Sequence, residues 1–188
     1  MVRPAGDTET CSMRGNEQYR ILPVSEAHIC GLHAIWDTVA REKRFLALLE
    51  APPKEDVRDF VRSNITCGNP HLVVLAETRV VGWCDIVRLA RPTMSHRGAL
   101  SVGLLPEWRG LGIGRQLLTQ IIRLAWDRQF RRIDLVARAD NINAIALYKT
   151  FGFATEGLRH KAFFVDGQYF DLLDMALLHP ELVESGPP

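Results

Sequence analysis

The chain has 188 residues, 47% of them hydrophobic and 24% charged, which is typical of one soluble globular domain and argues against a wholly disordered chain. Its 23 Lys and Arg residues against 22 Asp and Glu leave a net charge of +1, whereas dedicated nucleic-acid binders carry a large basic excess. No apolar run approaches the roughly 18 residues of a membrane span. The first residues lack the apolar core of a secretory signal, so we expect a cytoplasmic protein.

The two ends of the chain are expected to be tails around a single domain. Residues 1–16 are polar, contain Gly and Pro, and show no periodicity, which predicts a flexible N-terminal tail. Residues 180–188 predict a C-terminal tail. Residues 17–179 then form the domain, without an internal linker or repeat.

Hydrophobic spacing predicts a mixed α/β (α+β) fold, because strands come in a meander as well as singly between helices. In the first half the pattern predicts a strand at Tyr19–Leu22, a helix begun by Ser25, a helix at residues 54–62, and strands at 72–76 and 80–89 joined by a turn at Thr78-Arg79. In the second half it predicts a strand at 98–105, an amphipathic helix at 112–129, a strand at 133–137, a short helix at 141–151, and strands at 154–157 and 169–178 with a turn at Asp166-Gly167.

The four cysteines, Cys11, Cys30, Cys67 and Cys84, are expected to be reduced thiols. Cys30 and His33 could pair with Cys67 and His71 in a zinc-like arrangement. However, Cys30 and His33 lie inside a helical pattern without the turn that a zinc knuckle needs. A buried Cys and a hydrogen-bonded His are the simpler interpretation, and no metal is expected.

The segment from Leu105 to Arg115 carries the clearest chemical signal. A strand enters it, a helix leaves it, and glycines stand at every second position, at 110, 112 and 114. Bare backbone lets a phosphate approach the amide N–H groups, and the helix start adds positive partial charge. Arg109 and Arg115 flank the loop and can add full charges. The segment therefore predicts a loop that binds a pyrophosphate.

Two common nucleotide-binding motifs do not fit these glycines. A dinucleotide fingerprint is G-x-G-x-x-G, and a P-loop needs Lys and Ser or Thr after its last glycine, whereas Gly114 is followed by Arg115-Gln116. Both motifs are therefore disfavoured. A glycine-rich turn without a ligand remains the alternative.

Two motifs resemble those of the GNAT family of N-acetyltransferases. Arg109–Gly114 matches the family's R/Q-x-x-G-x-G/A signature, and Asn141–Phe153 is similar to its N-x-x-A-x-x-L-Y-x-x-x-G-F pattern. Glu156-Gly157 and residues 171–175 also fit its last strands, so the resemblance covers residues 17–179. Residues 159–171 are similar to a branch that includes amino-acid and ribosomal-protein acetyltransferases.

The resemblance implies the GNAT fold, a mostly antiparallel sheet with splayed middle strands and about four flanking helices, and acetyl-CoA as co-substrate. It implies that the pyrophosphate lies on Arg109, Gly110, Leu111, Gly112, Ile113, Gly114 and Arg115, and the pantetheine arm along Val102, Gly103 and Leu104. Gly103 would form the bulge that splays its strand from the next. Asn141 would line the coenzyme side. Tyr148 would be the catalytic general acid, or else a core aromatic residue.

The base is harder to assign. An ammonium group has no lone pair and a free alkyl amine has a pKa of about 10, so a proton acceptor is needed. Positions where many relatives have a catalytic Glu correspond to Ala99 and Val136, which cannot accept a proton. The base is therefore unassigned. Asp85 is one candidate catalytic base, directly or through water, with a surface carboxylate as the alternative. Glu107 is expected to point to solvent, and a water chain to the backbone is another option.

These implications predict transfer of an acetyl group from acetyl-CoA to a primary amine of a small molecule or amino acid, by direct attack on the thioester. The alternatives are a protein N-terminal or lysine acetyltransferase and a non-catalytic CoA-binding module. Residues that could wall the acceptor site, or else pack in the core, are Trp36, Phe45, Trp83, Phe163 and Phe164, and His160-Lys161 could meet an acidic acceptor. Many relatives are dimers, so a homodimer is the default expectation.

Overall fold

The computed structural model describes residues 10–14 and 17–184, and within them one eight-stranded sheet has the order β1-β2-β3-β4-β5-β6-β8-β7. Neighbouring strands are antiparallel except β5 and β6, which are parallel. The expected mixed, mostly antiparallel sheet is thus confirmed. The strands are β1 (Thr10–Arg14), β2 (Glu17–Pro23), β3 (His71–Ala76), β4 (Arg79–Arg88), β5 (Arg97–Leu104), β6 (Arg132–Arg138), β7 (Ala154–Val165) and β8 (Gln168–Leu178).

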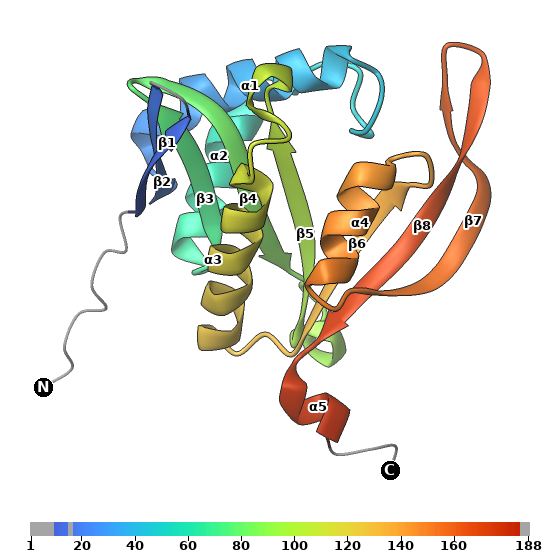
Figure 1. Cartoon of the computed structure of the whole chain (residues 1–188). Helices are drawn as coiled ribbons and strands as arrows, with labels where there is room; N and C mark the ends of the chain where they lie inside the picture. Colours follow the sequence, from blue (N-terminus) through green and yellow to red (C-terminus); the bar gives the residue numbers. More distant parts are fainter. Residues whose placement is uncertain (1–9, 15–16, 185–188) are drawn as a thin grey trace, which may run out of the picture.

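Helices cover both faces of the sheet (Figure 1). They are α1 (Ile29–Arg41), α2 (Lys54–Thr66), α3 (Ile113–Asp127), α4 (Ile142–Thr150) and the short α5 (Pro180–Glu184). Helices α1 and α2 pack on one face, where Trp36 of α1 contacts Trp83 of β4 with ring centroids 6.1 Å apart. Helices α3 and α4 lie on the other face (Figure 1). The buried stripe of α3 has the 3.6-residue period that its sequence predicts, at Leu117, Leu118 and Ile121. None of the described helices is long and apolar enough to cross a membrane.

The prediction of a tail at each end of the domain is wrong for part of each segment. Thr10–Arg14 forms β1, which pairs with β2 in antiparallel register. An edge strand gains its hydrogen bonds from its neighbour's backbone, which a search for hydrophobic periodicity does not detect. Pro180–Glu184 forms α5, and proline is well suited to the first position of a helix. The rest of the two expected tails, residues 1–9, 15–16 and 185–188, lies outside the described residues.

Two further boundaries differ from the sequence-based prediction. The turn between β3 and β4 is at Glu77-Thr78, one residue earlier than expected, with Glu77 at φ +50°. β7 runs from Ala154 to Val165 instead of ending at Gly157. As the last strand of the sheet it is exposed on both faces, and its register shifts between Arg159 and Phe163, so alternation of apolar residues is absent.

The strands in the middle of the sheet separate. β5 and β6 pair only from Arg97–Arg132 to Ala99–Asp134, and then they diverge (Figure 1). From Leu100 to Leu104, therefore, the edge of β5 is not covered by β6. This is the splay that the family resemblance implies.

Gly103 does not form the expected bulge. The register of β4 and β5 is continuous through the Trp83–Gly103 pair, and the splay begins earlier, after Ala99. A Cβ atom on Gly103 would lie 2.1 Å from Cη2 of Trp83. Glycine is needed here because the Trp83 indole ring packs across the backbone.

Candidate active site

A cavity of about 1130 Å³ opens where β5 and β6 diverge. It is lined by β5, the glycine loop, the start of α4, the end of β6 and the loop between α1 and α2. Ten of the predicted site residues line it, namely Val102, Gly103, Leu104, Arg109, Gly110, Gly112, Gly114, Arg115, Asn141 and Tyr148. The side chains of Leu111 and Ile113 do not, because Leu111 is exposed and Ile113 is fully buried in the core.

The glycine loop has the conformation that its sequence predicts. Gly110 has φ +72° and Gly112 has φ +79°, a region that favours glycine. A Cβ atom on either would have no heavy atom within 4 Å, so open space lies above this backbone. Gly114 serves packing instead, since a Cβ there would lie 3.2 Å from Leu147 of α4. The loop thus offers bare backbone at the N-terminus of the 15-residue helix α3, which suits a diphosphate.

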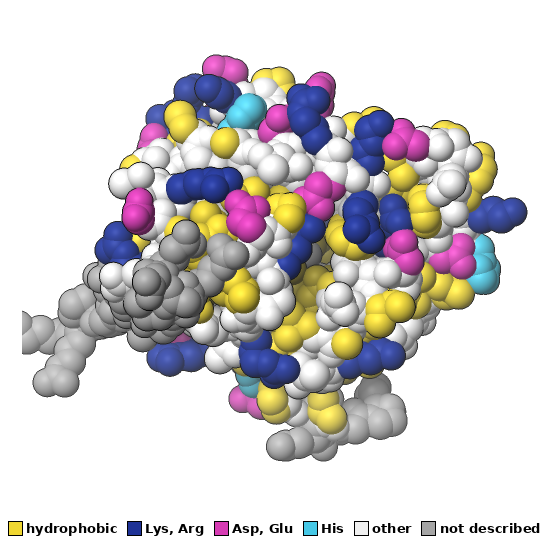
Figure 2. All heavy atoms as spheres, turned by 45° about the horizontal axis from the view of Figure 1, so that its top comes forward, with side chains coloured by type: hydrophobic (Ala, Val, Ile, Leu, Met, Phe, Trp, Pro, Cys, Tyr) yellow, Lys and Arg dark blue, Asp and Glu magenta, His cyan; other side chains and the backbone are white. Residues whose placement is uncertain are grey.

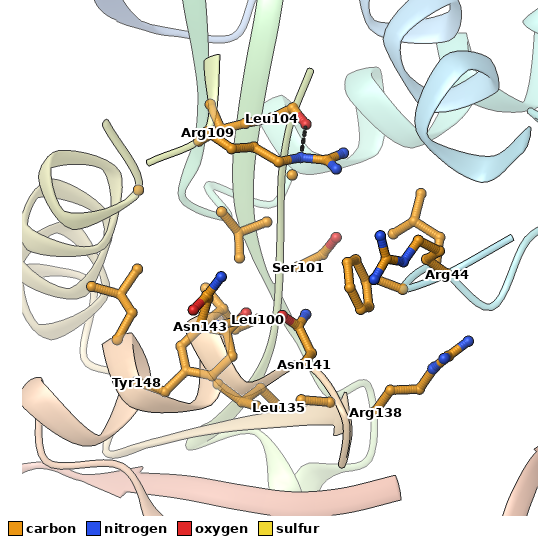
Figure 3. Close-up of a pocket in the computed structure, with 18 of the residues that line it drawn as sticks. Arg44, Leu100, Ser101, Leu104, Arg109, Leu135, Arg138, Asn141, Asn143 and Tyr148 are labelled. Atoms are coloured by element: carbon orange, nitrogen blue, oxygen red, sulfur yellow. Dashed lines mark hydrogen bonds between the residues drawn. The ribbon is translucent and has the colours of Figure 1, made fainter. Parts of the chain in front are cut away.

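The two arginines of the loop have different surroundings. Arg109 donates to both carboxylate oxygens of Glu42, at 2.8 and 2.6 Å, and its Nε donates to the Leu104 carbonyl at 2.9 Å (Figure 3). Its charge is therefore balanced inside the protein, and the side chain ties the loop to the end of α1. Arg115 is exposed, and it has no carboxylate partner among residues 17–184. Of these two arginines, Arg115 is therefore the one whose charge is available to a bound anion.

Tyr148 lies in α4 and is buried, with its ring 5.8 Å from that of Phe153. Burial, and to a lesser extent the nearby Cys84 thiol, raise the pKa of the Tyr148 hydroxyl well above its ordinary value. The hydroxyl is therefore protonated at neutral pH and can donate a proton. Figure 3 shows Tyr148 beside Asn143, on the opposite side of the cavity from Arg44 and Arg138.

Asn141 caps the helix that carries Tyr148. Its Oδ1 accepts a hydrogen bond from the Ala144 amide at 3.4 Å, which fixes the start of α4 at the cavity wall. Asn143 also lines the cavity, although its sequence position did not single it out.

Asp85 lies outside this cavity, on β4, and lines a smaller one of about 290 Å³. Its side chain is only 2% exposed, and its Oδ2 atom has no hydrogen-bond partner in the described part of the chain. The alternative of a surface carboxylate is therefore wrong. Burial raises the pKa of Asp85 to about 8 from an ordinary value of 3.8, because the charged form is poorly solvated. A carboxyl group with this pKa can accept a proton near neutral pH.

Asp85 and Tyr148 line different cavities that meet. Leu46, Leu100 and Ser101 line both of them. Ser101 is the cross-strand partner of Asp85 on β5, and its Oγ accepts a hydrogen bond from Trp83 Nε1 at 3.3 Å. The junction therefore lies next to Asp85, at the point where β5 leaves β6.

His71 is the cross-strand partner of Asp85 on the other side, in β3. Its Nδ1 accepts from Asn64 Nδ2 at 3.2 Å, and Asn64 Oδ1 accepts from Asn69 at 3.0 Å. Burial, with the charge of His28, lowers the pKa of His71 to about 4. His71 is thus hydrogen-bonded through Nδ1, whereas its buried Nε2 atom has no hydrogen-bond partner in the described part of the chain. Cys30 is exposed, not buried as expected, because it lies on the outer side of α1.

The expected acceptor wall divides between the two cavities. Phe45 and Phe163 line the larger cavity, and Trp36 and Trp83 line the smaller. Phe164 belongs to neither, since it is 59% exposed and packs on Tyr169. The pair His160-Lys161 also lines neither cavity: the His160 ring and the Lys161 amide both contact the Asp171 carboxylate.

Arg138 is a site residue that the sequence pattern did not reveal. It lies at the end of β6, is 5% exposed, and lines the larger cavity. Its guanidinium donates to both oxygens of Asp140 and lies 3.6 Å from the centroid of the Phe170 ring. Asp140, two residues later in the sequence, could have indicated an ion pair with Arg138. The contact with Phe170 could not be predicted locally, because that ring comes from a distant strand.

On the face shown in Figure 2, basic and acidic side chains are interspersed, in keeping with the small net charge.

Comparison with known proteins shows the family to which the chain belongs. A family model described as "Acetyltransferase (GNAT) family" matches residues 32–153, more than half of the chain. The L-amino acid N-acetyltransferase AaaT of Escherichia coli (strain K12) is 32% identical over 111 residues, which cover 58% of this chain and 68% of that protein.

Solved structures agree with the family match. The ribosomal-protein-alanine N-acetyltransferase of Brucella melitensis is 27% identical, with a TM-score of 0.79 over 85% of this chain and 99% of that chain. A phosphinothricin acetyltransferase of Sinorhizobium meliloti, in complex with AcCoA, shares the fold at 22% identity, with a TM-score of 0.83 over 90% and 93% of the two chains. The expectation of an acetyl-CoA-dependent acyltransferase is confirmed. The chain belongs to the GNAT family of acetyltransferases.

Proposed function

We propose that the protein transfers the acetyl group of acetyl-CoA to the primary amine of a small molecule or amino acid. The observation that carries this proposal is the larger cavity, where a bare glycine loop, an uncovered strand edge and a buried tyrosine meet. Acetyl-CoA supplies an acetyl group activated as a thioester, which the acceptor amine attacks directly.

The residues present fit this co-substrate. The loop from Arg109 to Arg115 would hold the diphosphate through backbone N–H groups and the Arg115 side chain. The edge of β5 at Val102, Gly103 and Leu104 would hold the extended arm by backbone hydrogen bonds, since β6 does not pair there. The open space above Gly110 and Gly112 supports this assignment, because a side chain would fill it.

Two side chains would handle the protons. Asp85, with its raised pKa of about 8, would accept a proton from the acceptor ammonium and leave the neutral amine. Tyr148, still protonated at neutral pH, would donate a hydrogen bond or a proton to the departing sulfur. Backbone N–H groups of β5 beyond Ala99 would stabilise the negative charge that develops on the carbonyl oxygen.

A contact at the rim of the site supports a small acceptor. Lys43, just after α1, forms an ion pair of 2.7 Å with Asp166 at the tip of the β7–β8 hairpin. This contact joins the loop after α1 to the β7–β8 hairpin, and both segments line the larger cavity, whereas a protein acceptor needs an open groove. We also propose a cytoplasmic location and a homodimer. Light scattering of the purified protein would test the dimer.

The function is tested by following thiol release from acetyl-CoA with a panel of primary amines, amino acids and peptides with a free N-terminus. Saturable turnover on a small amine or amino acid is expected. Turnover on peptides alone would replace the proposal with a protein acetyltransferase. Binding of acetyl-CoA without turnover on any acceptor would indicate a non-catalytic module.

Replacing Tyr148 by Phe should lower kcat by about 10- to 100-fold while the affinity for acetyl-CoA stays within about twofold. The ring and its packing against Phe153 are kept, and only the proton donor is lost. Steady-state kinetics together with calorimetric titration of acetyl-CoA measure the two quantities. An unchanged kcat would make Tyr148 a packing residue.

A further inference from the structure

The smaller cavity has a distinctive lining. The Trp36 ring contacts both the Phe60 ring and the Trp83 ring there, with centroids 5.4 Å apart for Trp36–Phe60 and 6.1 Å for Trp36–Trp83. Leucine, valine and alanine side chains make up most of the remaining wall. Asp85 is the ionisable group in this lining, and no Lys, Arg or His belongs to it within the described residues.

Two buried polar atoms at this cavity lack partners. Asp85 Oδ2 and Trp36 Nε1 make no hydrogen bond in the described part of the chain, although both are inaccessible to solvent. Buried polar groups are normally paired, and leaving them unpaired destabilises the fold. Such groups are tolerated where a ligand pairs with them.

The cavity is placed to present a ligand to the reaction. It shares Leu46, Leu100 and Ser101 with the larger cavity, and Ser101 faces Asp85 across the β4–β5 pair. A group that contacts Asp85 is therefore next to the uncovered edge of β5. A ligand body that extends away from this junction lies among the aromatic rings.

Charge and size limit what this ligand can be. One carboxyl group can balance one ammonium group, and a cation beside Trp rings is further stabilised by their π electrons. A polyamine would bring further buried charges without partners, at a large cost in free energy. A volume of about 290 Å³ is at the small end of ligand sites, enough for a single ring and too little for a peptide chain.

We infer that the smaller cavity binds the acceptor, and that the acceptor is a compact monoamine with an apolar, ring-sized body. Its ammonium group pairs with Asp85, which takes one proton from it. The nitrogen then forms a bond to the acetyl carbon as the carbon–sulfur bond breaks, and it loses its second proton to give the amide. Tyr148 supplies a proton to the departing sulfur, which leaves as the coenzyme thiol, and the proton lost by the nitrogen replaces the one that Tyr148 gave up. This inference rests on the proposed acetyl transfer.

Three probes test it by thiol release with the full-length protein: 2-phenylethylamine, ethylamine and spermidine. We expect kcat/KM for 2-phenylethylamine to exceed that for ethylamine by at least about 10-fold, because only the former buries a ring. We expect it to exceed that for spermidine by a similar factor. Equal or better use of ethylamine or spermidine overturns the inference and leaves the acetyl transfer intact. Thiol release with none of the three, despite release with another acceptor, overturns the inference alone.

Adjacent leucines provide a matched pair of variants. Leu48 lines the cavity and is 41% exposed, whereas Leu49 is 60% exposed and lines neither cavity. Leu48→Arg should raise KM for 2-phenylethylamine at least about 10-fold by adding a cation and bulk at the ring site, with acetyl-CoA affinity unchanged. Leu49→Arg should behave like the parent protein. Equal KM values for the two variants contradict the assignment, whereas absence of acetyl-CoA binding by the parent protein would contradict the proposed function as well.

Discussion

The Asp85→Asn variant is expected to lose at least about 100-fold in kcat while its affinity for acetyl-CoA is unchanged, because a general base contributes rate and not coenzyme binding. Asp85 lies on β4 and lines the smaller cavity, next to the junction with the coenzyme cavity, and one of its carboxylate oxygens has no partner among the described residues. Asn has the same shape as the protonated acid and cannot accept a proton. Thiol-release kinetics and calorimetry measure the two effects separately.

The pH profile gives a second readout of the same variant. Burial raises the pKa of Asp85 to about 8, so kcat/KM of the parent protein should rise with pH through about 8. The neighbouring titratable groups do not mask this step, because His71, with its pKa of about 4, is neutral there and burial raises the pKa of Cys84 well above its ordinary value. The acceptor amine titrates near pH ~10 and should be the step that persists in Asp85→Asn.

The free energy of unfolding should fall as pH rises toward about 8, whereas kcat/KM should rise over the same range. The pKa of Asp85 is higher in the folded state, so its contribution to stability is fully present below its ordinary pKa of 3.8 and is lost as pH rises toward about 8. Asp85→Asn removes this dependence. Thermal unfolding near neutral pH should therefore find the variant at least as stable as the parent protein.

Glu107→Gln is the control for Asp85. Glu107 lies beside the glycine loop and pairs with Arg79 at 3.3 Å, and both side chains are exposed. It should retain full activity and the parent pH profile. If Glu107→Gln lost activity and Asp85→Asn kept it, the base would have to be reassigned.

The Gly112→Asp variant should bind acetyl-CoA at least about 100-fold more weakly, or by about 2.8 kcal/mol. The new side chain would stand in the open space above the loop and would bring a negative charge to the diphosphate position. The positive φ of +79° adds strain of about 1–2 kcal/mol, which lowers stability without preventing folding. Calorimetric titration measures the affinity and thermal unfolding the stability.

Gly167→Asp separates backbone strain from coenzyme binding. Gly167 has φ +78° in the β7–β8 turn, a Cβ there would meet no atom within 4 Å, and the residue lines neither cavity. The two variants should lose similar stability, but only Gly112→Asp should lose affinity. Equal affinities in the two variants would mean that the loop does not hold the diphosphate.

Local pattern predicts much of this structure. Three features depend only on neighbouring residues in the sequence: the period of α3, the glycine spacing from 110 to 114 and the Asn141–Phe153 motif. The structure brings these segments together at one cavity. The parallel pairing of β5 with β6 and the splay beyond Ala99 follow from the resemblance, not from hydrophobic periodicity.

The errors come from contacts between distant segments. Arg109 looked like a free cation because Glu42, its partner, is far away in the sequence. Gly103 looked like a bulge because only the structure shows the indole of Trp83 lying across it. Asp85 could be taken for a surface residue because its burial depends on α1 and α2 covering β4, which no local pattern reports.

Calorimetric titration of the purified parent protein with acetyl-CoA tests the central claim most directly. Saturable binding of one molecule per chain is expected, and it should weaken as salt screens the contact of Arg115 with the diphosphate. Absence of any binding heat, with no rise in melting temperature at millimolar acetyl-CoA, would contradict the assignment of the glycine loop and of the cavity above it.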